Sequence, residues 1–170
     1  SQVKQMVHAP VIGIKKIPRG DYAAGDFRIT PTLREVELIL EAGADALAID
    51  GTRRERYDDL TLAAFVEEIK KRFGAFIIAD VSTAEEGAMA SAAGADMVGT
   101  TLSGYTPYSA NPIVFGQVPT PEPDYEIIRE LRQKGVQYIV AEGRYTNGLQ
   151  FARALEAGAH CVVIGSAITY

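Results

Sequence analysis

The chain has 170 residues, of which 47% are hydrophobic and 23% charged, with a net charge of −5 and a single cysteine. This length supports one domain with a substantial core, and the composition is ordinary for a globular protein. The acidic balance argues against general nucleic-acid binding, which needs a basic face, and no apolar run approaches the ~20 residues of a membrane span. A lone Cys161 excludes a disulfide framework, so we expect a cytoplasmic location and a small buried side chain there.

In chain order, the first strand is expected at 10–16, where an apolar run ends on two lysines. Thr30 and Pro31 are predicted to open a helix, as its cap and its first residue. Asp124 is predicted to cap a later helix, and a Ser/Thr–Glu capping box starts another near residue 84. The remaining predicted strands are 46–50, 75–80, 97–101, 138–142 and 161–164, and the remaining helices are 60–73, 84–93, 124–134 and 147–156.

Four of these strands are entered through nearly the same sequence, in which a glycine follows a helix: Gly43, Gly94, Gly135 and Gly158. Glycine is the common residue at a helix C-cap, and short, wholly apolar strands are typical of parallel sheets. Alternation of strands and helices requires right-handed crossovers in a parallel sheet. The stretch 103–123 has no helical period, and irregular segments of this length are usually functional or disordered.

The predicted fold is α/β, of the (β/α)8 TIM-barrel type. Six strands can be counted where a closed barrel has eight, so we expect 1–170 to form a single, incomplete barrel domain that lacks the first two strands and the last helix. An open parallel α/β sheet is the alternative. No glycine-rich dinucleotide fingerprint follows any strand, which weakens that alternative.

Charged side chains end four of the expected strands: Lys16, Asp50, Asp80 and Glu142. In a β/α barrel this rim carries the chemistry. A lysine there can hold phosphate, form a Schiff base or transfer a proton, whereas a solvated surface lysine is the ordinary alternative. The carboxylates can orient hydroxyls, cap the next helix, move protons or form structural ion pairs.

Small and hydroxyl-bearing residues follow other strands of the predicted barrel. Barrels often bind phosphate through backbone N–H groups after their last two strands, which here offer Gly143, Gly165 and Ser166. The hydroxyl-rich segment 100–106 suits either sugar binding or loop capping. The charged run 53–56 is expected to be a solvated loop, and neither histidine has neighbours at metal-ligand spacing.

Seven segments together resemble the N-acetylmannosamine-6-phosphate 2-epimerase family: PVIGIKK at 10–16, ITPT at 29–32, AIDGT at 48–52, ADVST at 79–83, GTTLSGYT at 99–106, AEGR at 141–144 and GSAIT at 165–169. The resemblance covers essentially the whole chain, and GTTLSGYT is its most specific piece. It implies a barrel that interconverts N-acetylmannosamine 6-phosphate and N-acetylglucosamine 6-phosphate in sialic-acid catabolism, with no cofactor and no metal.

The resemblance also implies roles for individual residues. Lys16 and Glu142 match the catalytic lysine and glutamate of the family. Asp80 matches an acidic residue that binds substrate, Arg144 follows the glutamate, and Gly143, Gly165 and Ser166 fall at the phosphate end. From the hydroxyl-rich segment we add Thr101, Ser103 and Tyr105, and with them Arg144, as expected substrate-binding residues. The expected partner is a small sugar phosphate, with no nucleic acid and no membrane, and the expected assembly is a homo-oligomer such as a dimer. Two alternatives stay open: another phosphate-binding barrel isomerase or decarboxylase, and an inactive barrel fragment.

Overall fold

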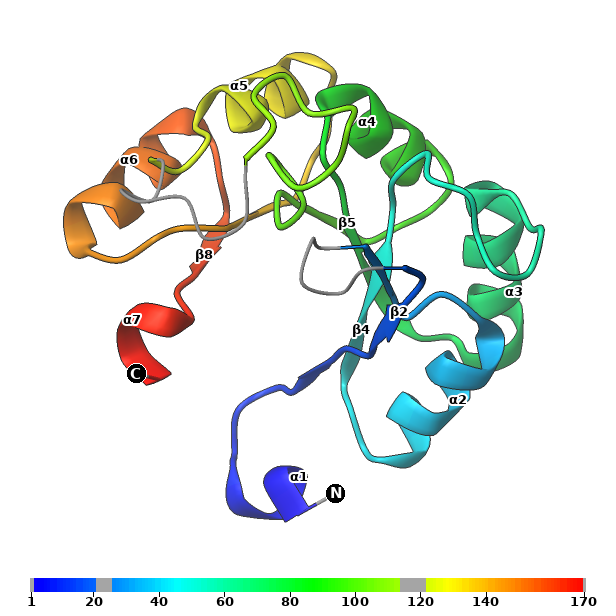
Figure 1. Cartoon of the computed structure of the whole chain (residues 1–170). Coiled ribbons are helices and arrows are strands. Elements are labelled where there is room, and N and C mark those ends of the chain that lie inside the picture. Colours follow the sequence, from blue (N-terminus) through cyan, green and yellow to red (C-terminus); the bar gives the residue numbers. More distant parts are fainter. Residues whose placement is uncertain (1, 21–25, 114–121, 170) are drawn as a thin grey trace.

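The structure is a computed structural model that describes residues 2–20, 26–113 and 122–169. Its main sheet has six parallel strands in the order β1-β4-β5-β6-β7-β8. The strands are β1 (Ile12–Gly13), β4 (Ala46–Asp50), β5 (Phe76–Asp80), β6 (Met97–Gly99), β7 (Ile139–Glu142) and β8 (Cys161–Val163). Figure 1 shows this sheet curling into an open arc, which confirms a sheet of the β/α-barrel type over the described residues.

Helices cover the outside of the arc, and the short α1 (Gln2–Met6) and α7 (Ser166–Thr169) lie toward its open side (Figure 1). No helix of the described residues has the length and apolar content needed to cross a membrane. The outer helices are α2 (Leu33–Glu41), α3 (Leu62–Phe73), α4 (Ala84–Ala92), α5 (Glu126–Gln133) and α6 (Gly148–Ala157).

The repeated glycines end these helices as expected. Gly43, Gly94, Gly135 and Gly158 all have φ between 81° and 114°, in the left-handed region. A residue with a Cβ is strained in that conformation, so glycine lets the chain leave the helix and enter the next strand. At the other end of α4, Thr83 and Glu86 form the predicted capping box. These local signals therefore determine where a helix ends and the chain turns into the next strand.

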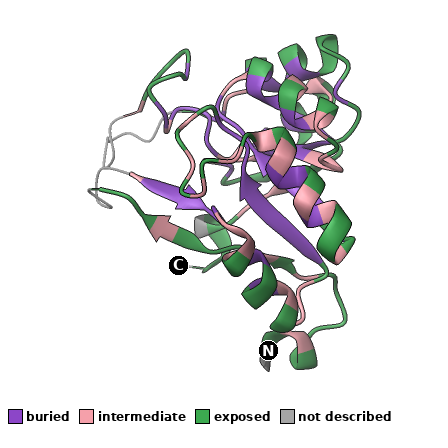
Figure 2. Cartoon of the chain, turned by 90° about the vertical axis from the view of Figure 1, so that its right-hand side faces the viewer, coloured by how far each residue is buried: buried purple, intermediate pink, exposed green. Residues whose placement is uncertain are grey.

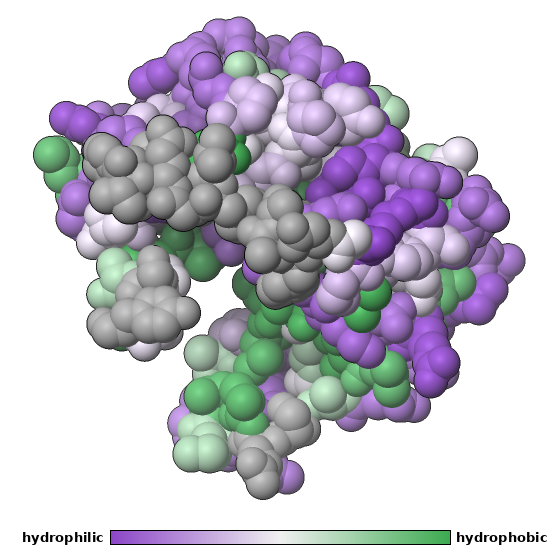
Figure 3. Space-filling view, viewed as in Figure 1, coloured by the Kyte–Doolittle hydropathy of each residue, from purple (hydrophilic) through white to green (hydrophobic). Residues whose placement is uncertain are grey.

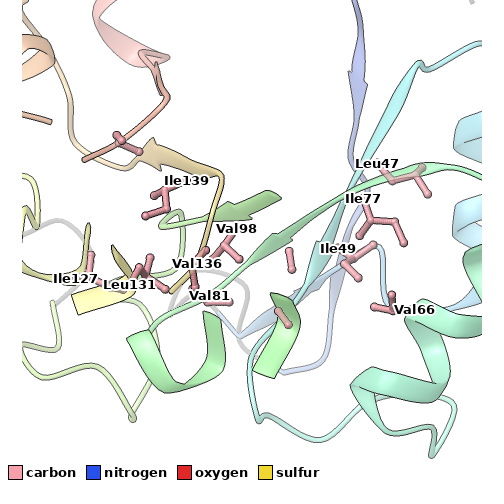
Figure 4. Close-up of a cluster of buried hydrophobic side chains, with 14 of the residues drawn as sticks. Leu47, Ile49, Val66, Ile77, Val81, Val98, Ile127, Leu131, Val136 and Ile139 are labelled. Atoms are coloured by element: carbon pink, nitrogen blue, oxygen red, sulfur yellow. The ribbon is translucent and has the colours of Figure 1, made fainter. Parts of the chain in front are cut away.

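The core lies between the strands and the inward faces of the helices. Leu47, Ile49 and Ile77 are fully buried and pack with Phe65 and Val66 of α3. Figure 4 shows how strand and helix side chains share this core. In Figure 2 the central strands of the sheet are buried, while the outer helix surfaces are exposed. This layering leaves the strand ends free to carry polar groups.

Two expectations about the N-terminal part were wrong. The predicted strand 10–16 is split into β1 and β2 (Lys16–Pro18), and β2 pairs antiparallel with β3 (Phe27–Ile29). The cap of α2 is Thr32, because Thr30 instead exchanges hydrogen bonds with Lys15 and continues the hairpin. The β2–β3 hairpin packs beside β4. Lys16 therefore reaches the strand ends as the first residue of this hairpin, and not as the last residue of a strand in the main sheet.

The two outermost strands of the described sheet are more exposed than the sequence suggested. Cys161 is exposed, contrary to the expectation of a buried side chain, because β8 has no further strand beside it among the described residues. Figure 3 shows apolar residues gathered beside the open side of the arc. The N-terminal segment contributes exposed large apolar side chains there: Val3, Met6, Val7, Ile12 and Ile14.

Candidate active site

Three carboxylates end neighbouring or nearby strands at one rim of the sheet. Asp50 ends β4, Asp80 ends β5 and Glu142 ends β7. Asp50 and Asp80 are register partners, and Asp80 in turn pairs with Gly99 at the end of β6. Because all these strands are parallel, their carboxyl ends meet at the same edge. The register places Asp50 and Asp80 side by side, and Glu142 lies two residues beyond Val140, the β7 partner of Gly99.

A cavity of about 430 Å³ lies at this rim. The cavity is lined by seven of the residues singled out from the sequence: Lys16, Thr101, Tyr105, Glu142, Gly143, Arg144 and Gly165. Its size is within the ordinary range for a small-molecule site. The structure thus brings Lys16 and Glu142, which are distant in sequence, into one cavity.

Lys16 reaches the cavity from the β2–β3 hairpin. Its ammonium nitrogen lies 4.8 Å from the centre of the Phe27 ring, a cation–π contact that orients the side chain. The preceding Lys15 points elsewhere, with its Nζ 3.8 Å from a carboxylate oxygen of Glu35. Lys16 therefore lines the cavity, whereas Lys15 faces Glu35 outside it.

Glu142 is partly buried and its backbone is fixed by a neighbouring strand. The hydroxyl of Thr100 donates to the carbonyl of Glu142 and accepts from its N–H, both at 3.0 Å. Burial raises the pKa of Glu142, while a hydrogen bond from Thr101 and the charge of Lys16 act in the opposite direction. A carboxyl with a raised pKa next to an amine is suited to proton transfer.

Asp80 lies just behind the cavity lining. Its Oδ1 accepts a 2.7 Å hydrogen bond from the hydroxyl of Thr101, which itself lines the cavity. Burial raises the pKa of Asp80 well above its usual value, and the charge of Glu142 adds to this effect. Asp80 is thus a buried acid in contact with the site through Thr101.

The expected phosphate end has small residues at the cavity wall. Gly143 has a φ of 112°, which a residue with a Cβ rarely adopts, and both Gly143 and Gly165 line the cavity. Their main chain is therefore open to approach by an anion. Ser166 begins α7, and its side chain lies outside the described residues.

Two expected substrate-binding residues have other contacts. The hydroxyl of Ser103 donates to Asp124 at 2.6 Å, and Ser103 is not among the residues that line the cavity. Arg144 lines the cavity, but two of its N–H groups donate to the carbonyls of Ser103 and Glu122, at 2.9 and 3.2 Å. Arg144 therefore fastens the two described ends of the 103–123 stretch beside the site.

Part of the cavity wall was not predicted from the sequence. Phe27 and Ile29 come from the unpredicted hairpin, whose three-residue strands carry no readable period. Tyr145 is buried in the wall, and its position directly after the predicted Gly143-Arg144 turn could have marked it. The site is consequently more aromatic and more apolar than the motifs indicated.

The charged run 53–56 is solvated only in part, because Arg53 and Glu55 are exposed whereas Arg54 and Arg56 are not. The side chain of Arg54 is 8% exposed and donates to Asp50 at 2.6 Å. The guanidinium of Arg56 lies 3.9 Å from the Phe65 ring centre and donates to the carbonyls of Asp50 and Pro31. Arg54 thus commits the Asp50 carboxylate to a structural ion pair, and Asp50 is not among the residues that line the cavity.

An amine and two carboxyls gathered at the carboxyl rim of a curled parallel sheet define an acid–base enzyme of the β/α-barrel class. A family model described as "Putative N-acetylmannosamine-6-phosphate epimerase" matches residues 1–170. The chain belongs to this N-acetylmannosamine-6-phosphate epimerase family.

Individual relatives agree with the family match. A protein of Cutibacterium acnes and one of Caldanaerobacter subterraneus, both named "Putative N-acetylmannosamine-6-phosphate 2-epimerase", are each 44% identical over 100% and 98% of this chain, and over 69% and 66% of their own length. The solved N-acetylmannosamine-6-phosphate 2-epimerase of Clostridium perfringens superposes with a TM-score of 0.83 at 34% identity, over 99% of this chain and 68% of that one. The chain thus spans about two thirds of the length of these relatives.

Proposed function

We propose that the chain carries the acid–base chemistry that interconverts N-acetylmannosamine 6-phosphate and N-acetylglucosamine 6-phosphate. These sugars differ in configuration at C2. In the open-chain aldehyde the C2 proton lies next to a carbonyl, so a base can remove it to give an enolate. Return of a proton to the opposite face completes the epimerisation.

The observation that carries this proposal is the convergence of Lys16 and Glu142 on one cavity. Lys16 transfers the C2 proton, and Glu142 serves as its acid–base partner for ring opening and proton return. Asp80, held through Thr101, orients the sugar hydroxyls together with Tyr105. The main chain at Gly143, Gly165 and Ser166 receives the phosphate.

The test is deuterium incorporation at C2 from heavy water, measured by proton NMR with N-acetylmannosamine 6-phosphate as substrate. Lys16→Ala and Glu142→Ala should each slow incorporation by about 10²–10⁴-fold, the usual contribution of a positioned acid or base. Lys15→Ala is the matched control, because that neighbouring lysine faces Glu35. Undiminished exchange in both cavity variants would refute the assignment, and exchange with a ribulose phosphate instead would favour another sugar-phosphate isomerase.

The expected dimer and the expected cytoplasmic location are also proposals. The exposed apolar side chains of the N-terminal segment and the exposed Cys161 on the edge strand β8 support self-association. Light scattering coupled to size-exclusion chromatography tests the dimer, which a monomer at micromolar concentration would refute.

A further inference from the structure

Thr101 stands between the two carboxyls of the candidate site. It lies two residues after the end of β6 (Met97–Gly99), and β6 lies between β5, which ends on Asp80, and β7, which ends on Glu142. Its hydroxyl oxygen is 2.7 Å from Oδ1 of Asp80, and Thr101 lines the same cavity as Glu142, whose pKa its side chain lowers. The Thr101 hydroxyl is therefore bonded to one acid and lies in the same cavity wall as the other.

A hydroxyl has a single proton to donate but can accept through its oxygen at the same time. When Asp80 is ionised, Thr101 donates to Asp80 and has nothing left for Glu142. When Asp80 is protonated, its own O–H can donate to the Thr101 oxygen, which frees the hydroxyl proton for Glu142. The rotation of one hydroxyl thus depends on where the proton of the carboxyl pair resides.

We propose that Thr101 is a positioning residue that couples Asp80 to Glu142, so that the proton held by Asp80 directs the Thr101 hydrogen bond to Glu142. This coupling deepens the proposed epimerase function and rests on it, because that function assigns roles to both carboxyls. When Asp80 is protonated, the Thr101 hydrogen bond stabilises the ionised form of Glu142, which can then accept a proton. When Asp80 is ionised, Glu142 loses this hydrogen bond.

Other charged groups face the same pair and stay in place when Thr101 is changed. Lys16 approaches from β2 and favours the charged forms of both acids. Asp50 faces Asp80 from β4 and opposes its ionisation, although Arg54 holds Asp50 at 2.6 Å. Arg144 also lines the cavity. A substitution confined to the Thr101 hydroxyl therefore separates its effect from these charges.

The experiment is a titration of side-chain carboxyls by ¹³C NMR on the chain labelled in aspartate and glutamate, with Asp80→Asn and Glu142→Gln assigning the two signals. Thr101→Val, which lacks the hydroxyl, should raise both midpoints by about 0.5–1 pH unit, the size expected for loss of one hydrogen bond to a carboxylate. It should also reduce the shift that Asp80→Asn causes at Glu142. Thr101→Ser keeps the hydroxyl and should titrate as the unsubstituted chain does.

Thr146→Val is the matched control, because the Thr146 hydroxyl bonds to Gln150 and is not part of the cavity wall. Thr101→Ala is a second hydroxyl-free variant should Thr101→Val fail to fold. Unchanged midpoints in the hydroxyl-free variants, or an equal shift in Thr146→Val, overturn the coupling. The titration needs no substrate, so the coupling and the epimerase function can fail separately. Shifted midpoints in the hydroxyl-free variants, with no C2 exchange in the unsubstituted chain, would support the coupling and refute the epimerase function. C2 exchange with unchanged midpoints would support the epimerase function and refute the coupling.

Discussion

Gly99 gives a direct test of the geometry around Asp80. It ends β6 and is the register partner of Asp80 in β5. A Cβ at position 99 would lie 2.3 Å from Oδ1 of Asp80 and 3.3 Å from the hydroxyl oxygen of Thr101. Gly99→Ala should therefore displace the Asp80 carboxylate and break its 2.7 Å hydrogen bond to Thr101.

The cost follows from the size of this clash. Ordinary contacts of a methyl group lie near 3.5–4 Å, so the buried carboxylate has to move by roughly 1 Å. Overpacking of this kind costs about 1–3 kcal/mol, and the lost hydrogen bond adds about 1 kcal/mol. Gly99→Ala should accordingly lower the free energy of unfolding by about 2–4 kcal/mol.

Urea denaturation followed by circular dichroism measures this change. Gly148→Ala is the matched control: Gly148 begins α6 and its Cβ would meet nothing within 4 Å, so alanine there should add about 0.4–1 kcal/mol. In an Asp80→Ala background the clash partner is absent, and Gly99→Ala should cost less than about 1 kcal/mol. Equal effects of Gly99→Ala with and without Asp80 would show that the reasoning is wrong.

Three further changes test the surroundings of the site, each by the same denaturation measurement. Glu86→Ala should lower the free energy of unfolding by about 4 kcal/mol, because its buried carboxylate accepts from three N–H groups and one hydroxyl. Glu85→Ala is the control: its side chain is exposed, so the free energy of unfolding should fall by under about 1 kcal/mol. Arg56→Met should cost about 2–4 kcal/mol, since it leaves two carbonyls unpaired and removes a stacked guanidinium. Tyr145→Phe should raise the free energy of unfolding by about 1 kcal/mol, because the Tyr145 hydroxyl is buried without a hydrogen-bond partner among the described residues.

The main sheet was predictable because each βα unit repeats the same local signals. An apolar run, a helical period and a glycine at the helix end are all short-range features, and Gly43 and Gly158 take the backbone conformations that they imply. The position of Glu142 at a strand end followed from the same pattern. The rim of the candidate site could thus be located from sequence alone.

The β2–β3 hairpin was not predictable in this way. Its strands have three residues each, and the bond that ties Thr30 to Lys15 joins residues whose pairing no local pattern reveals. The expectation of a solvated loop at 53–56 was wrong for Arg54 and Arg56 for a related reason, whereas Arg53 and Glu55 are exposed as expected. Charge density suggests exposure, but Arg54 and Arg56 find buried acceptors on other elements, and only the folded chain supplies these.

The three carboxylates of the rim show why position alone does not assign a role. Asp50 is neutralised by Arg54 at 2.6 Å, which commits it to the fold. Burial opposes ionisation of Asp80, whose hydrogen bond to Thr101 ties it to the cavity. Of the three carboxylates, only Glu142 lines the cavity together with Lys16. The remaining charged residue in the described lining is Arg144. The partner of each carboxyl, rather than its place at a strand end, therefore separates structural support from proton transfer.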